Sequence, residues 1–262
     1  MKIITELRNH AEVVVRAFIA FLAVTGCGAS SAPIEPPHTT APRTYRVLFI
    51  GNSLTYFNDL PGTVAGLAQR TNVTMHVASV AGPNLALIDH VEGSSNALEV
   101  IGQGSWHYVV LQQGPSALPV SRDTLVLATR LLASHIEAVG ARTALLMVWP
   151  ELSRFMVFDD VGDSYRAAAA EVGGLFLPAG EAWRAAWVSD PQLPLYGPDG
   201  YHPSELGTYL AALVVYEGIT GNDSRELPDE AIVGGRNIGV PGSRVRLLQE
   251  AAHETVTRFA RN

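Results

Sequence analysis

Lysine and cysteine are almost missing from this sequence of 262 residues, in which Lys2 is the sole lysine and Cys27 the sole cysteine. If the mature chain begins at Cys27, as the signal-like pattern described below implies, it has no lysine for a Schiff base and none for a phosphate-binding P-loop. A single cysteine forms no internal disulfide, and it supplies too few thiolates for a structural zinc site. Nucleophilic chemistry must therefore use a hydroxyl, a carboxylate or an imidazole.

Positive charge is also scarce. The formal net charge is -7, and 16% of the residues are charged. Proteins that bind nucleic acid present a basic surface, so this composition argues against nucleic acid as a partner. The chain is 47% hydrophobic, and its length is enough to bury a full core as one domain or a small two-domain protein.

The first 26 residues have the pattern of a signal peptide. Three basic residues precede an apolar run at residues 17–24, which is too short to span a bilayer, since spanning needs ~20 residues. Thr25 and Gly26 then precede Cys27. The letters V-T-G-C resemble the lipobox of bacterial lipoproteins, which implies cleavage before Cys27 and a lipid anchor on it. By resemblance to the bacterial lipoprotein sorting pattern, Gly28 after the cysteine implies the outer membrane of the cell envelope rather than the inner. The alternative is an ordinary secretory signal with an incidental cysteine.

Residues 27–44 are rich in proline, serine and threonine, which predicts a tether without a packable face. Strand-like and helix-like stretches alternate over residues 45–262, and this alternation predicts a three-layer α/β/α sandwich around a parallel sheet of about five strands. Strands are expected at residues 47–50, 74–80, 108–111, 144–148 and 175–177. Helices are expected at residues 61–70, 84–91, 123–139, 162–172 and 203–219. A loop at 234–242 and a packing helix at 243–261 complete the domain.

The first chemical motif is R-V-L-F-I-G-N-S-L-T-Y-F-N, at residues 46–58. Its apolar run reads as a strand that is buried on both faces of the sheet. Ser53 follows the carboxyl end of this strand, where open α/β sheets place their ligands. The alternative is that Ser53 only caps a helix.

The second motif is P-D-G-Y-H-P-S-E-L-G, at residues 198–207. Pro203 is placed as the first residue of a helix, which puts His202 at the mouth of that helix. Asp199 can accept the Nδ1 proton of His202, which leaves Nε2 free to deprotonate a serine. The alternative is that Asp199 and His202 serve as ordinary capping residues.

Together the two motifs resemble the SGNH (GDSL-type) hydrolase superfamily. The resemblance implies a flavodoxin-like fold with Ser53 as nucleophile and with Asp199 and His202 as its catalytic partners. It also implies an oxyanion hole that includes the backbone N–H groups of Ser53 and Gly82, although Gly82 can also be read as a simple turn glycine. The order serine, aspartate, histidine, without a G-x-S-x-G motif, argues against the α/β-hydrolase fold.

The third block departs from the superfamily. Its usual G-x-N, whose asparagine donates to the oxyanion, is replaced here by V-V-L-Q-Q-G-P-S. A glutamine can donate the same hydrogen bond, and the Q-G-x-S spelling resembles carbohydrate acetylesterase branches, which favours Gln113 over Gln112. Because side chains alternate along a strand, only one of the two faces the site, and the sequence does not decide which.

Other residues have weaker patterns. Trp149, Tyr56 and Phe57 can line a substrate pocket or pack in the core, and Asn52 can orient the nucleophile loop or merely shape its turn. Four histidines lack metal-ligand spacing, and we interpret them as ordinary surface or capped residues, namely His76, His90, His107 and His135.

These patterns predict a lipid-anchored serine esterase that uses neither metal nor cofactor. The expected substrate is a small-molecule or glycan ester, with O-acetylated glycans favoured by the Q-G-x-S resemblance. A lipase or thioesterase of the same superfamily, and a non-catalytic glycan-binding lipoprotein of the envelope, are the alternatives.

Overall fold

Five parallel strands form the central sheet. The computed structural model describes residues 43–260, and its strands are β1 Arg43–Gly51, β2 Val73–Ala81, β3 Tyr108–Leu111, β4 Arg142–Leu146 and β5 Leu175–Leu177. They lie in the order β2-β1-β3-β4-β5, and each neighbouring pair is parallel. The predicted five-stranded parallel sheet is confirmed. The predicted signal peptide and lipidation at Cys27 lie outside the described residues.

The apolar runs explain the central strands. Residues 47–50 of β1 and all of β3 are buried, because each strand has neighbours on both sides and helices on both faces. The edge strand β2 has a more exposed pattern. The chain leaves β1 for β2 on one side and then crosses to β3 on the other, so the order of the strands reverses at β1. In doubly wound sheets such a switch point is where ligands bind, beyond the carboxyl ends of the strands.

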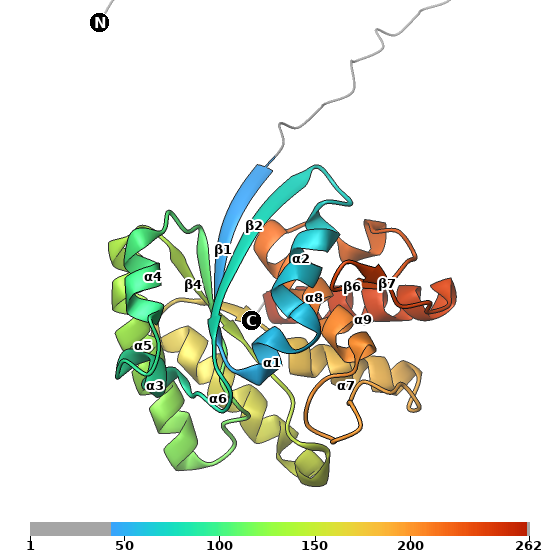
Figure 1. Cartoon of the computed structure of the whole chain (residues 1–262). Coiled ribbons are helices and arrows are strands. Elements are labelled where there is room, and N and C mark those ends of the chain that lie inside the picture. The colour runs from blue at the N-terminus through green and yellow to red at the C-terminus, as the bar shows by residue number, and fades with distance from the viewer. Residues whose placement is uncertain (1–42, 261–262) are drawn as a thin grey trace, which may run out of the picture. The chain divides into compact units, whose positions relative to one another are not determined.

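Helices cover both faces of the sheet (Figure 1). One layer contains α2 Leu60–Ala68, α7 Ala179–Ser189, α8 Glu205–Thr220 and α9 Gly242–Ala260, which contact one another. The other contains α3 Leu87–Val91, α4 Ala97–Gln103, α5 Pro119–Ala138 and α6 Phe158–Glu171. A short helix, α1 Ser53–Tyr56, follows β1 directly. The three-layer α/β/α prediction is confirmed, and α9 is the predicted terminal packing helix.

Three details differ from the predictions. Helices α4 and α7 were not expected, and a small hairpin of β6 Ile232–Val233 and β7 Arg236–Asn237 overlaps the predicted loop. Helix α8 begins at Glu205 and not at Pro203, because the Ser204 hydroxyl caps it by accepting the N–H of Gly207 at 3.1 Å. This helix is also buried on all sides, since α2, α7 and α9 surround it.

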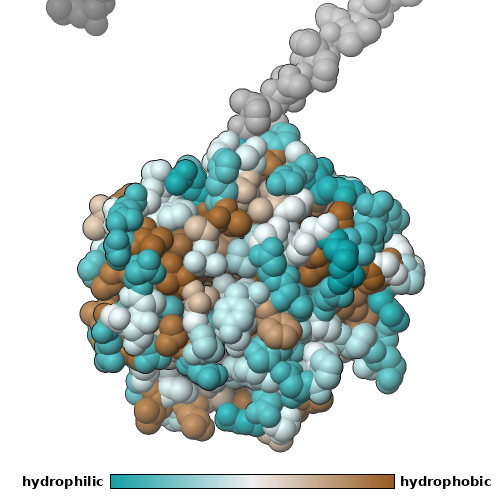
Figure 2. All heavy atoms as spheres, viewed as in Figure 1, coloured by the Kyte–Doolittle hydropathy of each residue, from teal (hydrophilic) through white to brown (hydrophobic). Residues whose placement is uncertain are grey.

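The surface is mixed in polarity. Figure 2 shows hydrophilic residues over much of one face, with hydrophobic residues gathered over α4 and α5. Exposed apolar side chains on or beside α5 include Leu118, Val120, Leu127 and Leu131. No helix in residues 43–260 is both long enough and apolar enough to cross a membrane.

Candidate active site

The turn at residues 51–55 carries the candidate nucleophile Ser53, and we call it the nucleophile turn. It begins at Gly51, where β1 ends. A side chain at this position would collide with Gln112, since a Cβ would lie 2.5 Å from Gln112 Oε1. Asn52 caps α1 by accepting the N–H of Leu54 at 3.1 Å, so the capping role that we considered for Ser53 belongs to Asn52. Ser53 is the first residue of α1, and its backbone N–H therefore has no acceptor within the helix.

The structure brings Ser53, His202 and Asp199 together in one chain of hydrogen bonds. The Nε2 atom of His202 lies 2.9 Å from Ser53 Oγ, and its Nδ1 atom lies 2.6 Å from Asp199 Oδ2. Nδ1 therefore carries the proton donated to the carboxylate, which leaves a lone pair on Nε2 facing the serine hydroxyl. This arrangement is that of a nucleophile, its general base and the carboxylate that orients the base.

The turn at residues 199–202 holds the Asp199 carboxylate in position. Its Oδ1 atom accepts the N–H groups of Tyr201 at 3.0 Å and His202 at 2.9 Å, and Gly200 adopts the left-handed φ of 68° that closes the turn. The hydrogen bond from the His202 ring, together with the N–H of Tyr201, lowers the pKa of Asp199 to about 2. Asp199 is therefore a carboxylate at any pH near neutrality.

Three further hydrogen bonds fix the loop at residues 197–204, which we call the histidine loop, either within itself or to the segment after β4. Gly197 N–H donates to His202 O at 2.7 Å, Leu152 N–H donates to Gly200 O at 2.8 Å, and Trp149 Nε1 donates to Tyr201 O at 3.0 Å. Trp149 is buried and stacks on Trp183, so it belongs to the core. Its predicted alternative role as a pocket wall is wrong.

Phe57 and Tyr56 remain on the surface beside the candidate catalytic residues. They are 39% and 42% exposed, respectively. The Phe57 ring stacks on the His202 imidazole with centroids 4.4 Å apart and planes inclined by 21°. Phe57 therefore lies where substrate would approach.

Gly82 follows β2 beside the nucleophile turn. Its N–H donates to Gly51 O at 3.3 Å, which is a long hydrogen bond. Asn52 Nδ2 donates to Leu85 O at 3.1 Å and ties the nucleophile turn to the loop that contains Gly82. That Gly82 donates to the oxyanion stays a prediction. For this role its N–H must leave Gly51 O and donate to the oxyanion instead.

The two glutamines after β3 have different tasks. Gln112 is fully buried behind the nucleophile turn, where its Oε1 accepts from Asn52 N at 3.1 Å and from Thr55 Oγ1 at 2.7 Å. Its Nε2 donates to the backbone oxygen of Gln113. Asn52 and Gln112 thus both orient the nucleophile turn, and sequence reasoning missed this role of Gln112.

Gln113 faces α3 and the loop that follows β3. Its Oε1 accepts the N–H of Leu87 at 2.9 Å, and its Nε2 donates to Ser116 Oγ at 2.7 Å. A primary amide carries two N–H groups, so the second hydrogen on Nε2 remains for another acceptor. The buried Tyr165 hydroxyl fixes the backbone of Gln113 by accepting its N–H and donating to its carbonyl oxygen.

The interpretation of His90 as a surface or capped residue is wrong. The ring is fully buried under the nucleophile turn, with Nε2 3.0 Å from Gly51 O and Nδ1 2.7 Å from Ser95 Oγ. Since a carbonyl only accepts, Nε2 carries the hydrogen in that bond. Burial lowers the pKa of His90. The available sequence signal was its spacing from Leu87, which places both on the inner side of α3.

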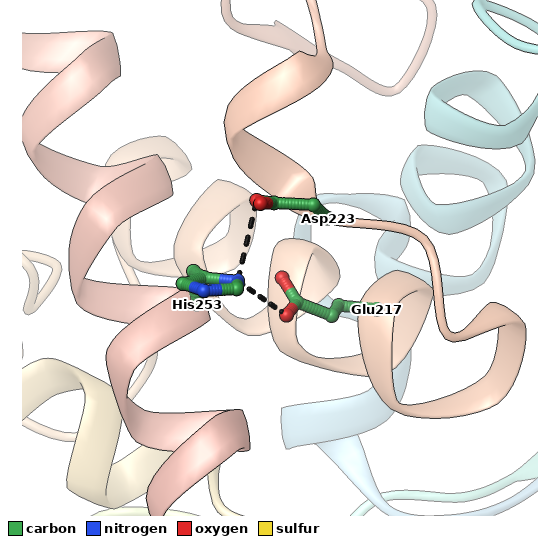
Figure 3. Close-up of side chains that lie close together, drawn as sticks. All are labelled: Glu217, Asp223 and His253. Carbon is green, nitrogen blue, oxygen red and sulfur yellow. Dashed lines mark hydrogen bonds and ion pairs between the residues drawn. The ribbon is translucent and has the colours of Figure 1, made fainter.

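One cluster of ionisable groups lies away from this site. Figure 3 shows His253 of α9 between two carboxylates, with Nδ1 2.8 Å from Glu217 and 3.2 Å from Asp223. Glu217 also accepts the N–H of Ser224, and Arg225 pairs with Asp223. The potential ligand atoms are thus already engaged, and Arg225 supplies a competing cation. We interpret the cluster as an ion-pair network that fastens α9 to α8. That the protein needs no metal stays a prediction.

Known structures share this fold, although no protein-family model and no curated protein matches the sequence. A DUF4886 family protein from Bacteroides uniformis has a TM-score of 0.71 at 20% identity, over 82% of this chain and 95% of that chain. A proposed SGNH hydrolase from Slackia heliotrinireducens has a TM-score of 0.59 at 26% identity, over 68% and 100%. A mutant of Axe2, an acetyl-xylooligosaccharide esterase from Geobacillus, has a TM-score of 0.51 at 18% identity, over 69% and 97%.

Proposed function

We propose that this SGNH-hydrolase-like protein hydrolyses carboxylic esters through an acyl-enzyme. The observation that carries the proposal is the continuous hydrogen-bonded chain from Asp199 through His202 to Ser53. His202 takes the proton of Ser53 as the hydroxyl attacks the ester carbonyl, and it then protonates the departing alcohol. Water, deprotonated by the same imidazole, releases the acid and restores the serine. Asp199 keeps the imidazole in the correct tautomer and stabilises its charged form.

The oxyanion of each tetrahedral intermediate requires donors that are already in place. We assign the backbone N–H groups of Ser53 and Gly82 and the Nε2 amide of Gln113 to this task. The support is positional, since Ser53 begins α1 and Gly82 is bonded to the end of β1. No step of this scheme calls for a metal or cofactor.

For the substrate, we propose O-acetyl groups on glycans of the bacterial envelope. The support is the Q-G-P-S spelling after β3 and the fold shared with an acetyl-xylooligosaccharide esterase. In the same proposal a lipid on Cys27 holds the domain at the membrane, with the outer membrane favoured by Gly28. The mixed and net negative composition fits a glycan partner better than a nucleic acid.

A fluorophosphonate probe tests the proposed chemistry. We expect the wild-type protein to be labelled covalently at Ser53, because the imidazole activates that hydroxyl, and we expect Ser53→Ala to remain unlabelled. Intact-protein mass spectrometry measures the added phosphonate, and Ser121→Ala, on the exposed start of α5, is the matched control. A folded wild-type protein that never reacts would instead support the non-catalytic glycan-binding alternative.

A groove beside the histidine loop favours a second substrate class, namely esters with a longer acyl chain. Leu152, Phe155, Trp187 and Tyr196 line this open space of about 520 Å³, which reaches Gly197. The indole N–H of Trp187 and the hydroxyl of Tyr196 are bonded to backbone oxygens, so their rings present apolar surface. A longer acyl chain, as in a lipase or thioesterase substrate, fits such a lining.

Nitrophenyl esters of acetate, butyrate and octanoate separate the two substrate classes. If the site serves O-acetyl groups, we expect kcat/KM to be highest for acetate and to fall with chain length, because longer chains find no matching contacts. If the groove takes the chain, each buried CH₂ adds about 0.8 kcal/mol, so octanoate gains more than tenfold over acetate. Phe155→Ala should then lower kcat/KM for octanoate and leave acetate unchanged.

A further inference from the structure

The turn after the nucleophile helix has an unusual backbone. Asn58 and Asp59 both have φ of 54°, in the left-handed region that residues other than glycine rarely adopt. Asparagine and aspartate tolerate this region better than other side chains. Two such residues in succession persist only where the surrounding structure fixes them, and they are common at functional sites.

The side chain of Asn58 connects this turn to the histidine loop and to the start of α8. Its Nδ2 atom donates to Pro203 O at 3.0 Å and to Thr208 Oγ1 at 3.0 Å. Pro203 directly follows His202, and Thr208 belongs to the helix that begins after it. Apart from the bond between Ser53 and His202, these are the hydrogen bonds that we find between residues 52–59 and 197–208 of the described chain.

The neighbours of Asn58 fix both ends of the same turn. Before it, Phe57 stacks on the His202 ring. After it, Asp59 caps α2 by accepting the N–H of Gly62 at 3.0 Å, and Thr63 Oγ1 donates to Asp59 O at 2.8 Å. The turn is therefore anchored to α2 on one side, and its left-handed backbone places the ring of Phe57 and the amide of Asn58 against the histidine loop.

We propose that Asn58 is a positioning residue that sets the separation between the Ser53 hydroxyl and the His202 imidazole. The inference rests on the proposed hydrolytic function. The other bonds of the histidine loop, from Gly197, Leu152 and Trp149, fasten it within itself or to the segment after β4. Within the described residues, the amide of Asn58 and the stacked ring of Phe57 link it to the segment that bears Ser53, besides the bond between Ser53 and His202 itself, and of these only the amide hydrogen-bonds to its backbone.

Isosteric replacement provides the test. Asn58→Asp keeps the size and the tolerance of a left-handed φ, but its carboxylate cannot donate to Pro203 O. Asn58→Gly keeps the backbone conformation and removes the side chain altogether. For both variants we expect kcat to fall about 10-fold to 100-fold with KM nearly unchanged, since small misplacements of reacting groups have effects of this size. The rate of labelling by fluorophosphonate should fall in parallel.

The controls separate positioning from folding. Asp59→Asn retains the left-handed residue and the cap of α2, and we expect wild-type kcat. The downfield proton signal of the bond between His202 and Asp199 should persist in Asn58→Asp, because that bond lies within one turn. Wild-type kcat in both Asn58 variants would overturn the proposal, and so would a loss that only follows the unfolded fraction in thermal melts. A wild-type protein that resists the probe would refute the hydrolytic function itself.

Discussion

Replacing Asp199 by asparagine is expected to lower kcat about 10⁴-fold while leaving the protein folded. The amide can accept from the ring through its oxygen, but it can also present N–H to His202 and favour the tautomer with the hydrogen on Nε2. That tautomer cannot deprotonate Ser53, although the 2.9 Å separation of the two side chains is unchanged. The neutral amide also fails to stabilise the imidazolium that forms in the transition state.

The same carboxylate bears on the pH dependence of the proposed activity. Its lowered pKa of about 2 means that the contribution of the charged form is present above that value and is lost only as the pH falls through it. Mild acidification is therefore not expected to protonate Asp199, and the carboxylate should keep its orienting role there. Measurements of kcat at a series of pH values, for the wild type and for Asp199→Asn, check this expectation and the loss predicted for the asparagine variant.

Asp163→Asn is the matched control for this substitution. Asp163 is an exposed carboxylate on α6 that pairs with Arg166. It should keep wild-type kcat. If Asp199→Asn lost less than about tenfold, the carboxylate would not be orienting the base, and the proposed triad would have to be abandoned.

The parts of this molecule that were predictable depend on local pattern. Continuous apolar runs predict the central strands, because a strand that is buried on both faces of a sheet carries apolar side chains on both faces. The turn from Asp199 to His202 is also local, since Gly200 and two backbone N–H groups bring carboxylate and ring together within four residues. Ser53 needed only its place after the first strand.

The residues that sequence reasoning missed depend on contacts between distant segments. His90 was read as an ordinary surface or capped residue, yet its ring hydrogen-bonds to Gly51, 39 positions earlier in the chain. Asn58 meets Pro203 across 145 positions. Neither the spacing of residues nor the composition indicates which distant residues of the chain will meet. The unexpected helix α7 has a similar cause, because Gly180 weakens its pattern but permits close approach to the segment after β4, where a Cβ would lie 2.5 Å from Val148 O.

Gln113→Ala is expected to lower kcat about 10² to 10³-fold, the usual effect of removing one oxyanion donor. The alanine variant also leaves the buried N–H of Leu87 without its acceptor. Gln113→Glu is the sharper change, since a glutamate oxygen still accepts from Leu87 while the N–H donor is gone. Both variants should keep KM within a few-fold and lose kcat, as measured with the best nitrophenyl ester.

Gln112→Ala provides the comparison, and the structure predicts a different kind of defect. Its loss removes the acceptor for Asn52 N and Thr55 Oγ1, and each buried donor left unsatisfied costs about 1–3 kcal/mol. Thermal melts should therefore show a lower Tm for Gln112→Ala, which leaves two donors without an acceptor, than for Gln113→Ala, which leaves one, and kcat should be compared per folded molecule. Equal small losses of kcat would remove both glutamines from the oxyanion hole. A larger loss per folded molecule in Gln112→Ala would show that holding the nucleophile turn matters more than the amide donor of Gln113, because the Oε1 atom of Gln112 accepts two hydrogen bonds from that turn.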